Sequence, residues 1–216
     1  MRTAICLSGE PRSLNLVHKN LKETFNKYFY HYTIFAFIPK CNTSHQVEEC
    51  LPDAIIQVRE DEDIDDSLIP SNHRLASGPQ RFLQQMNGWK GSNMMRKEYE
   101  LANGVIFDFV IRCRTDVRFT SSLPDLKDLS DHTLYIPSFH CFTGLNDRFC
   151  IGSPKVIDNY MDAIDIYYED PTKLVHAEEF LKYCLQRSKC KIEKLDVRFN
   201  RVRENGEECN WDSTDT

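Results

Sequence analysis

Short apolar runs and longer amphipathic stretches alternate along the first part of the chain. Residues 3–7 are apolar and predict a buried strand, whereas apolar residues recur at helical spacing over 13–30 and predict an amphipathic helix. β-Branched and aromatic residues over 33–38 predict a second strand. A short helix over 46–51 and a third strand over 54–58 follow. Because strands and helices alternate, we expect an α/β fold with parallel strands joined by right-handed crossovers.

The pattern that follows predicts two helices separated by a break. Residues 79–86 have helical spacing, and Gly88 and Gly91 then enclose a Trp-Lys pair, which indicates an interruption. Ser92 is expected to cap the second helix, which ends at Asn103.

The later part of the chain continues the alternation of strands and helices. We expect strands over 134–136 and 149–151, a helix from Ser153 to Ile164, a helix from Asp170 to Leu185, and one or two closing strands within 192–202. With 216 residues, the chain is expected to fold as one domain with at most a small appendage.

A buried strand in the middle of the chain ends in a group of charged side chains. Residues 107–111 contain one polar residue and predict a strand buried on both faces. Because side chains alternate along a strand, Arg112, Arg114 and Asp116 should project to one side at its carboxyl end, where open α/β sheets bind ligands. Arginines suit phosphate oxygens, and a carboxylate suits a divalent ion that also contacts phosphate. The alternative is a surface hairpin in which one arginine pairs with Asp116.

The turn after the first strand is a second candidate for ligand binding. Gly9 lets backbone approach a phosphate or base closely, and Ser8 offers a hydroxyl. Arg12 adds a cation near the start of the next helix, where backbone N–H groups favour anions. The alternative is a plain strand-to-helix turn with Ser13 as the N-cap. The spacing matches neither a GxGxxG loop nor a P-loop.

Further polar residues are candidates for the same site. Asn146 and Asp147 belong to a polar triplet between apolar flanks, so they are expected either to bind a sugar or, in the case of Asp147, to pair with Arg148. Arg96 lies just upstream of the central strand together with two lysines, and we expect these cations either to reach the end of that strand or to face water.

Composition and charge narrow the function classes. Nine cysteines with no zinc-type spacing predict a reduced, intracellular protein, and we expect neither a signal peptide nor a transmembrane segment. The net charge of −6 argues against nucleic acid as a partner. A phosphate ligand must therefore meet a local cluster of cations.

Three segments carry a resemblance to a known family: Leu7-Ser8-Gly9-Glu10-Pro11-Arg12, Arg112-Cys113-Arg114-Thr115-Asp116 and Asn146-Asp147-Arg148-Phe149-Cys150-Ile151-Gly152. In this order they resemble the small GT-A glycosyltransferases, in particular those that chlorella viruses and related large DNA viruses encode for building capsid glycans. The resemblance implies a Rossmann-like, mixed and mainly parallel central sheet of about six strands flanked by helices. The resemblance spans most of residues 3–203, so we expect one domain over residues 1–203. Residues 204–216 are polar and acidic and are expected to form a tail, or a linker toward further domains of a longer chain.

The resemblance also implies an activity. The expected donor is a UDP-sugar, the acceptor is a glycan or glycoprotein, and the metal is Mn²⁺ or Mg²⁺ at a DxD motif. Arg114 occupies the place of the first Asp of that motif, so Asp116 alone is expected to bind the metal. Asp147 is expected to orient the acceptor hydroxyl, and a cytoplasmic location follows, in the host if the chain is viral. The expected substrate-binding residues are Leu7, Ser8, Gly9, Arg12, Arg96, Arg112, Arg114, Thr115, Asp116, Asn146 and Asp147.

Two other function classes compete with a metal-dependent glycosyltransferase. A sugar-phosphate nucleotidyltransferase usually carries a glycine-rich first loop, and residues 8–12 contain only one glycine. A non-catalytic nucleotide- or glycan-binding module of a longer polypeptide is suggested by the missing Asp and by the linker-like tail.

Overall fold

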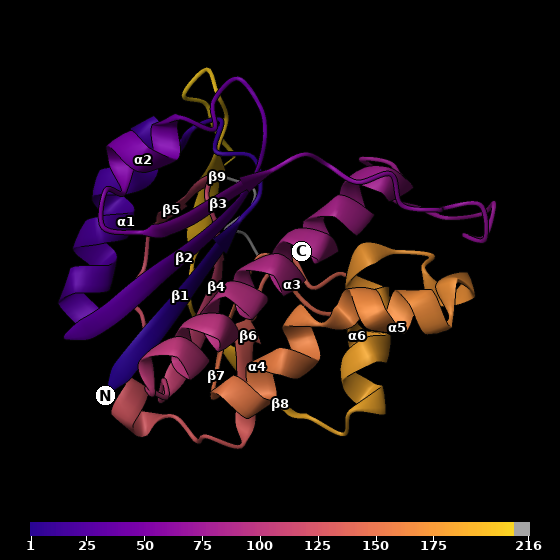
Figure 1. Ribbon diagram of the computed structural model, residues 1–216. Helices are drawn as coiled ribbons and strands as arrows, with labels where there is room; N and C mark the ends of the chain where they lie inside the picture. The colour runs from indigo at the N-terminus through magenta and orange to yellow at the C-terminus, as the bar shows by residue number, and fades with distance from the viewer. Residues whose placement is uncertain (210–216) are drawn as a thin grey trace.

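The computed structural model describes residues 1–209 and places seven strands in one central sheet, in the order β3-β2-β1-β4-β7-β6-β8 (Figure 1). The strands are β1 (Arg2–Ser8), β2 (His31–Pro39), β3 (Ile55–Arg59), β4 (Phe109–Arg114), β6 (Thr133–Pro137), β7 (Phe149–Gly152) and β8 (Lys191–Leu195). Neighbours pair in parallel, except that β7 is antiparallel to both β4 and β6. The predicted mixed, mainly parallel sheet is therefore confirmed, with seven strands where about six were expected.

Helices cover both faces of this sheet (Figure 1). They are α1 (Leu14–Tyr28), α2 (Gln46–Cys50), α3 (Pro79–Asn103), α4 (Pro154–Met161), α5 (Ala163–Glu169) and α6 (Ala177–Arg187), with 3-10 turns η1 (Leu126–Asp128) and η2 (Pro171–Lys173). The apolar run of β1 explains this arrangement, because Ala4 and Cys6 join the core under α3 to α6 while Ile5 and Leu7 join the core under α1 and α2. No helix within residues 1–209 is long and apolar enough to cross a membrane.

A smaller antiparallel sheet brings the end of the chain back to the end of β4. It consists of β5 (Val117–Phe119), β9 (Phe199–Val202) and β10 (Glu208–Cys209), in the order β10-β9-β5. Val202 N–H donates to the carbonyl of Asp116 at 2.8 Å, and the Ser13 hydroxyl donates to the Val202 carbonyl at 2.7 Å. Part of the predicted polar tail is thus a strand, and residues 210–216 lie outside the described residues.

The predicted break at Gly88 and Gly91 is wrong, because α3 is one continuous helix. A Cβ on Gly91 would lie 2.3 Å from the Phe37 ring, and one on Gly88 would lie 3.2 Å from Ser8 Cβ. The glycines therefore let the helix approach β1 and β2 closely, instead of interrupting it. The Ser92 hydroxyl donates to the Trp89 carbonyl within the helix at 2.9 Å, so Ser92 is not an N-cap.

Other boundaries differ in smaller ways. The helix predicted after Ser153 divides at Asp162 into α4 and α5. Asp170 opens only a 3-10 turn, and α6 starts later, at Ala177. The closing segment contains two strands, β8 and β9.

Candidate functional site

The two turns singled out in the sequence lie at the same edge of the sheet. β1 and β4 are parallel neighbours with Ser8 opposite Arg114, so the turns that follow them are adjacent. Gly9 has a φ of +112°, and the Thr115 hydroxyl donates to the carbonyl of Glu10 at 2.9 Å. This edge is the carboxyl end of two parallel strands, the position where open α/β sheets bind ligands.

Asp116 is enclosed by arginines. Arg114 Nε donates to one carboxylate oxygen and Nη2 to the other, both at 2.7 Å, and Arg12 Nη2 lies 3.4 Å from the second oxygen. Only 2% of the Asp116 side chain is exposed. Burial alone would raise the pKa of Asp116, but the charges of Arg114, Arg12 and Arg201 lower it to about 2. Asp116 is therefore a carboxylate at neutral pH with both oxygens engaged.

The contacts of Arg114 and Asp116 agree in part with each of the two predictions for this segment, a ligand site and a surface hairpin. Arg114 and Asp116 do form a pair, as the hairpin alternative predicted. The hairpin itself is absent from residues 109–119, because β5 leaves the central sheet and pairs with β9. The charged pair consequently faces the turn after β1 and the Arg12 side chain.

Asp147 joins this group through Gln85 of α3. Arg114 Nη1 donates to Gln85 Oε1 at 3.3 Å, and Gln85 Nε2 donates to Asp147 Oδ2 at 2.8 Å. Arg112, which is fully buried against the Trp89 ring, donates through Nη1 to the Asp147 carbonyl at 2.6 Å. Burial opposes ionisation, but the Arg148 and Arg112 charges lower the pKa of Asp147. The chain between β6 and β7 is thereby fixed to the end of β4.

Several predicted residues contribute structure rather than a ligand-binding side chain. Asn146 is fully buried, donates to the Phe139 carbonyl at 2.8 Å and accepts from Arg148 N–H at 2.9 Å. The Leu7 side chain lies in the core under α1, so only its backbone reaches this edge. The Asp147–Arg148 pair foreseen as the alternative is present at 3.8 Å.

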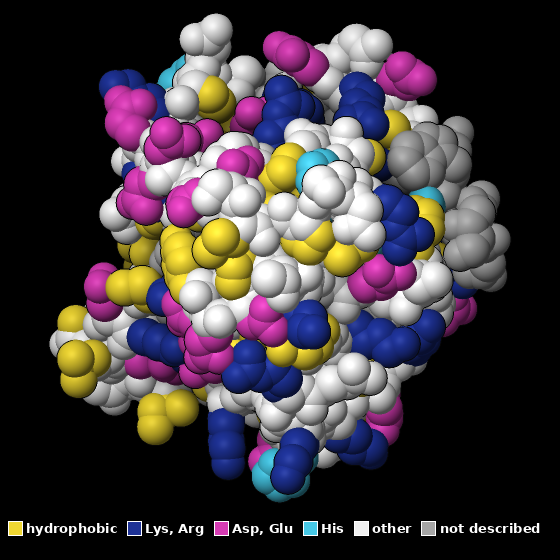
Figure 2. Space-filling view, turned by 90° about the vertical axis from the view of Figure 1, so that its right-hand side faces the viewer, with side chains coloured by type: hydrophobic (Ala, Val, Ile, Leu, Met, Phe, Trp, Pro, Cys, Tyr) yellow, Lys and Arg dark blue, Asp and Glu magenta, His cyan; other side chains and the backbone are white. Residues whose placement is uncertain are grey.

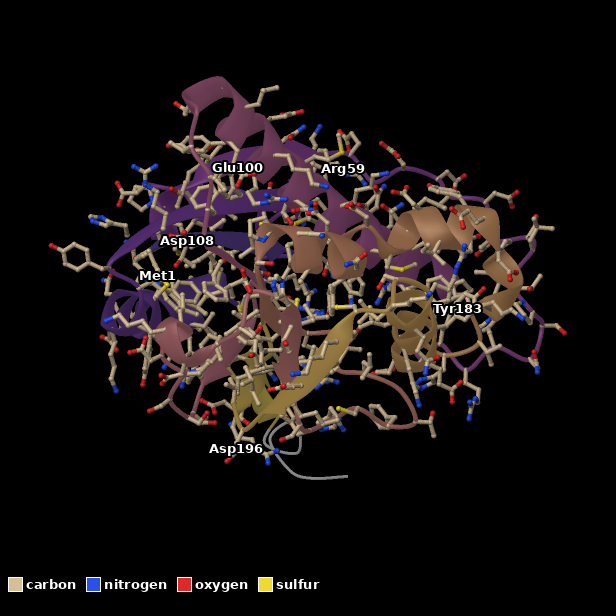
Figure 3. The ribbon with its side chains drawn as sticks, turned by 90° about the horizontal axis from the view of Figure 1, so that it is seen from below. Met1, Arg59, Glu100, Asp108, Tyr183 and Asp196 are labelled. Carbon is tan, nitrogen blue, oxygen red and sulfur yellow. The ribbon has the colours of Figure 1, made fainter. Side chains whose placement is uncertain are left out.

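Arg96 is not at this site. Its guanidinium donates to Asn93 (3.0 and 2.8 Å), Glu100 (2.6 Å) and Asp158 (2.8 Å), and only 2% of the side chain is exposed. Figure 3 shows Glu100 on the same side of the molecule as Met1 and Asp108, at the amino end of β1. The expectation that Arg96 reaches the end of the central strand is therefore wrong, because α3 continues without a break and carries this residue in the opposite direction.

The two lysines near Arg96 are also engaged elsewhere. Lys90 lies 2.5 Å from Asp165, and Lys97 lies 3.1 Å from Asp162. Figure 2 shows acidic and basic side chains interspersed over one face of the molecule. The cations of the site are thus a local group of arginines.

Glu178 is a buried carboxylate that the sequence did not single out. It occupies the first turn of α6, its side chain is 8% exposed, and one oxygen lies 3.0 Å from His176 Nδ1. Burial, and then the negative charge of Asp147, raise the pKa of Glu178 to about 7, although Arg148 and Arg201 act in the other direction. Two neighbouring carboxylates therefore have opposite tendencies: Asp147 stays ionised and Glu178 takes up a proton near neutral pH.

The feature of the sequence that is connected with Glu178 is a glycine, Gly144, which lies against the Glu178 backbone. A Cβ on Gly144 would lie 2.0 Å from the Glu178 backbone, and Leu145 N–H donates to the Glu178 carbonyl at 3.0 Å. Only glycine permits this approach of the loop to α6.

The donor set does not fit a divalent cation. Within residues 1–209 no three His, Cys, Asp or Glu side chains are grouped so as to hold a metal ion, and both oxygens of Asp116 already accept from Arg114. Five arginines act on the carboxylates of Asp116, Asp147 and Glu178: Arg12, Arg112, Arg114, Arg148 and Arg201. Guanidinium groups of this kind suit the oxygens of a phosphate. A cavity of about 440 Å³ lies beside Arg12 and is lined further by Arg203, Glu204 and Asn205.

Comparisons with known proteins found one family model and matches among solved structures. Two crystal structures of the glycosyltransferase GlyE from Streptococcus pneumoniae TIGR4, one of them the apo form, match with 14% (apo) and 16% identity and a TM-score of 0.47 each. Each match covers 90% of this chain and 45% of the other, so this chain spans less than half the length of those proteins. A search of curated proteins gave no match. The family model described as a domain of unknown function (DUF7796) matches residues 1–203, and the chain belongs to this family.

Proposed function

We propose that this protein is a glycosyltransferase that moves a sugar from a nucleoside-diphosphate sugar, with UDP as the expected nucleotide, to a hydroxyl of a glycan. The observation that carries the proposal is the pair of guanidinium groups, Arg12 and Arg114, at the adjacent carboxyl ends of β1 and β4. The resemblance of the sequence segments at this edge to small GT-A glycosyltransferases supports it. The relationship to the chlorella-virus enzymes stays a prediction.

The chemistry follows from where charge develops. When the bond between the anomeric carbon and the phosphate oxygen breaks, the nucleoside diphosphate gains negative charge and the anomeric carbon becomes cation-like. Arg12 and Arg114 are fixed by Asp116 before any ligand binds, so they stabilise the leaving diphosphate without rearrangement. One such preorganised donor contributes about 3 kcal/mol to lowering the barrier.

Glu178 is the better candidate for the residue that accepts the acceptor proton. A general base works best when its pKa lies near the working pH, and the Glu178 pKa of about 7 meets this condition. Asp147, which was predicted to orient the acceptor hydroxyl, has a lowered pKa and accepts a hydrogen bond from Gln85, so it is the weaker base. In this proposal Asp147 orients the acceptor and Glu178 takes the proton.

A panel of UDP-sugars tests the function. Slow hydrolysis or transfer by the wild-type protein, reduced about 10²-fold in Arg12→Ala, is the expected result. Arg187→Ala removes the same charge from the end of α6, where the side chain pairs with Glu169 at 2.7 Å, and serves as the matched control. Turnover that is absent with every sugar, although UDP binds, favours the alternative of a non-catalytic nucleotide-binding module.

A further inference from the structure

We propose that guanidinium groups bind the donor diphosphate without a divalent cation, and that Asp116 is a positioning residue for these groups rather than a metal ligand. This inference rests on the proposed function. It differs from the metal dependence expected from the sequence resemblance, and it starts from the contacts of Asp116 itself.

Both oxygens of the Asp116 carboxylate are already engaged by a guanidinium group. Each oxygen of Asp116 accepts a bond from Arg114 at 2.7 Å, and Arg12 lies 3.4 Å from one of them. This bidentate geometry is the strong form of an arginine–carboxylate pair. A metal ion could reach Asp116 only by separating the pair, which would leave a guanidinium that is 14% exposed beside a doubly charged cation.

Several buried hydrogen-bond donors of β1, β4 and the turn after β1 lack an acceptor. Arg12 Nε, the Ser8 hydroxyl and Arg112 Nε and Nη2 are buried and have no hydrogen-bond partner. Ser8 is 2% exposed, Arg112 is fully buried, and both lie on the strands that end at this edge. Buried donors without acceptors are costly, and the oxygens of a phosphate are the partners that a donor such as Arg12 Nε lacks. A cation would offer it none.

The reaction can then be written with the residues of this chain. The bond between the anomeric carbon and the phosphate oxygen breaks, and its electron pair stays on the nucleoside diphosphate, facing Arg12 and Arg114. The acceptor oxygen bonds to the anomeric carbon, and its proton passes to the Glu178 carboxylate. Atoms and charge balance without a further reactant.

Calorimetric titration of the whole chain with UDP, in EDTA and in Mn²⁺, tests the inference. We expect the same affinity in both buffers, and an affinity on the order of 10-fold to 100-fold weaker for Arg12→Ala, because a charge-assisted bond to phosphate is lost. Arg187→Ala should bind as the wild type does. Titration with Mn²⁺ alone should give no heat of binding.

The other outcomes separate this inference from the proposed function. UDP binding that requires Mn²⁺ and is lost in Asp116→Asn overturns the inference and leaves a glycosyltransferase. If none of the nucleotides UDP, GDP and CMP binds in either buffer, the proposed function is overturned as well. Arg114→Lys keeps the charge but loses the two-pronged contact with Asp116, so a folded Arg114→Lys protein with unchanged affinity would also contradict the inference.

Discussion

Replacing Glu178 by Gln should stabilise the protein at alkaline pH while it lowers turnover. The Glu178 pKa rises from 4.5 to about 7 on folding, because the side chain is buried and lies near the negative charge of Asp147. Each unit of pKa difference corresponds to about 1.4 kcal/mol, so the difference between the folded and unfolded pKa values lowers the free energy of unfolding at high pH by about 3 kcal/mol. His176, Arg148 and Arg201 are the other charged or titratable groups that act on this carboxyl.

The direction in which pH changes the free energy of unfolding follows from how many protons each state binds. Below pH 4.5 Glu178 is protonated in both the folded and unfolded states, and its contribution to stability is fully present. Between pH 4.5 and about 7 the folded state keeps a proton that the unfolded state has released, so the free energy of unfolding falls as pH rises. Gln has no proton to lose. The variant should therefore equal the wild type near pH 4 and be more stable by about 3 kcal/mol at pH 8.

Urea denaturation at pH 4 and pH 8 measures this difference, and the neighbouring Glu179→Gln is the matched control. Glu179 has a lowered pKa, caused first by its hydrogen bond from Thr143, so its replacement should not stabilise the protein at pH 8. In the proposed reaction Glu178→Gln also reduces turnover by about 10²-fold to 10⁴-fold. Equal or lower stability of Glu178→Gln at pH 8 would refute the electrostatic reasoning.

Three further predictions follow from packing and pairing. Gly91→Ala should destabilise the protein by about 1–3 kcal/mol in thermal denaturation, because its Cβ would lie 2.3 Å from the Phe37 ring, and Phe37→Leu should recover part of the loss. Arg96→Ala should destabilise by about 3–5 kcal/mol, because Glu100 and Asp158 lose their partner, yet folded molecules should turn over UDP-sugar at the wild-type rate. Asp116→Asn should lower turnover about 10-fold or more in EDTA, since Arg114 and Arg12 lose their charged anchor, whereas an unchanged rate would mean that Asp116 does not position them.

The parts of the fold that could be predicted are those in which the surroundings of a residue depend on the residues next to it in sequence. The continuous burial of β1 after Arg2 follows directly from an apolar run with both faces covered. The charged end of β4 and the turn after β1 were each predicted as candidates for ligand binding, and they meet in the structure because carboxyl ends of neighbouring parallel strands lie at one edge. Asp116 and Arg114 lie at this edge, where both oxygens of Asp116 accept hydrogen bonds from Arg114, a pairing that was predicted only as the alternative.

The parts that could not be predicted depend on contacts distant in sequence. Gly91 resembles a helix breaker until Phe37 is seen against it, and Arg96 then moves away from the site with the continuous helix. β5 pairs with β9, a segment whose sequence gives no register for that contact. Glu178 is an ordinary helical glutamate in the sequence, and only the packing of α6 against the Asp147 loop buries it.

A crystal structure of the protein with UDP, grown with EDTA, shows whether the arginines hold the diphosphate without a metal. Diphosphate oxygens should lie within 2.7–3.2 Å of Arg12 and Arg114 nitrogens, at the hydrogen-bond distances usual for N–H donors. Asp116 should keep both contacts with Arg114. A diphosphate bound away from β1 and β4, or an Asp116 turned from Arg114 toward a metal in crystals grown with Mn²⁺, would contradict it.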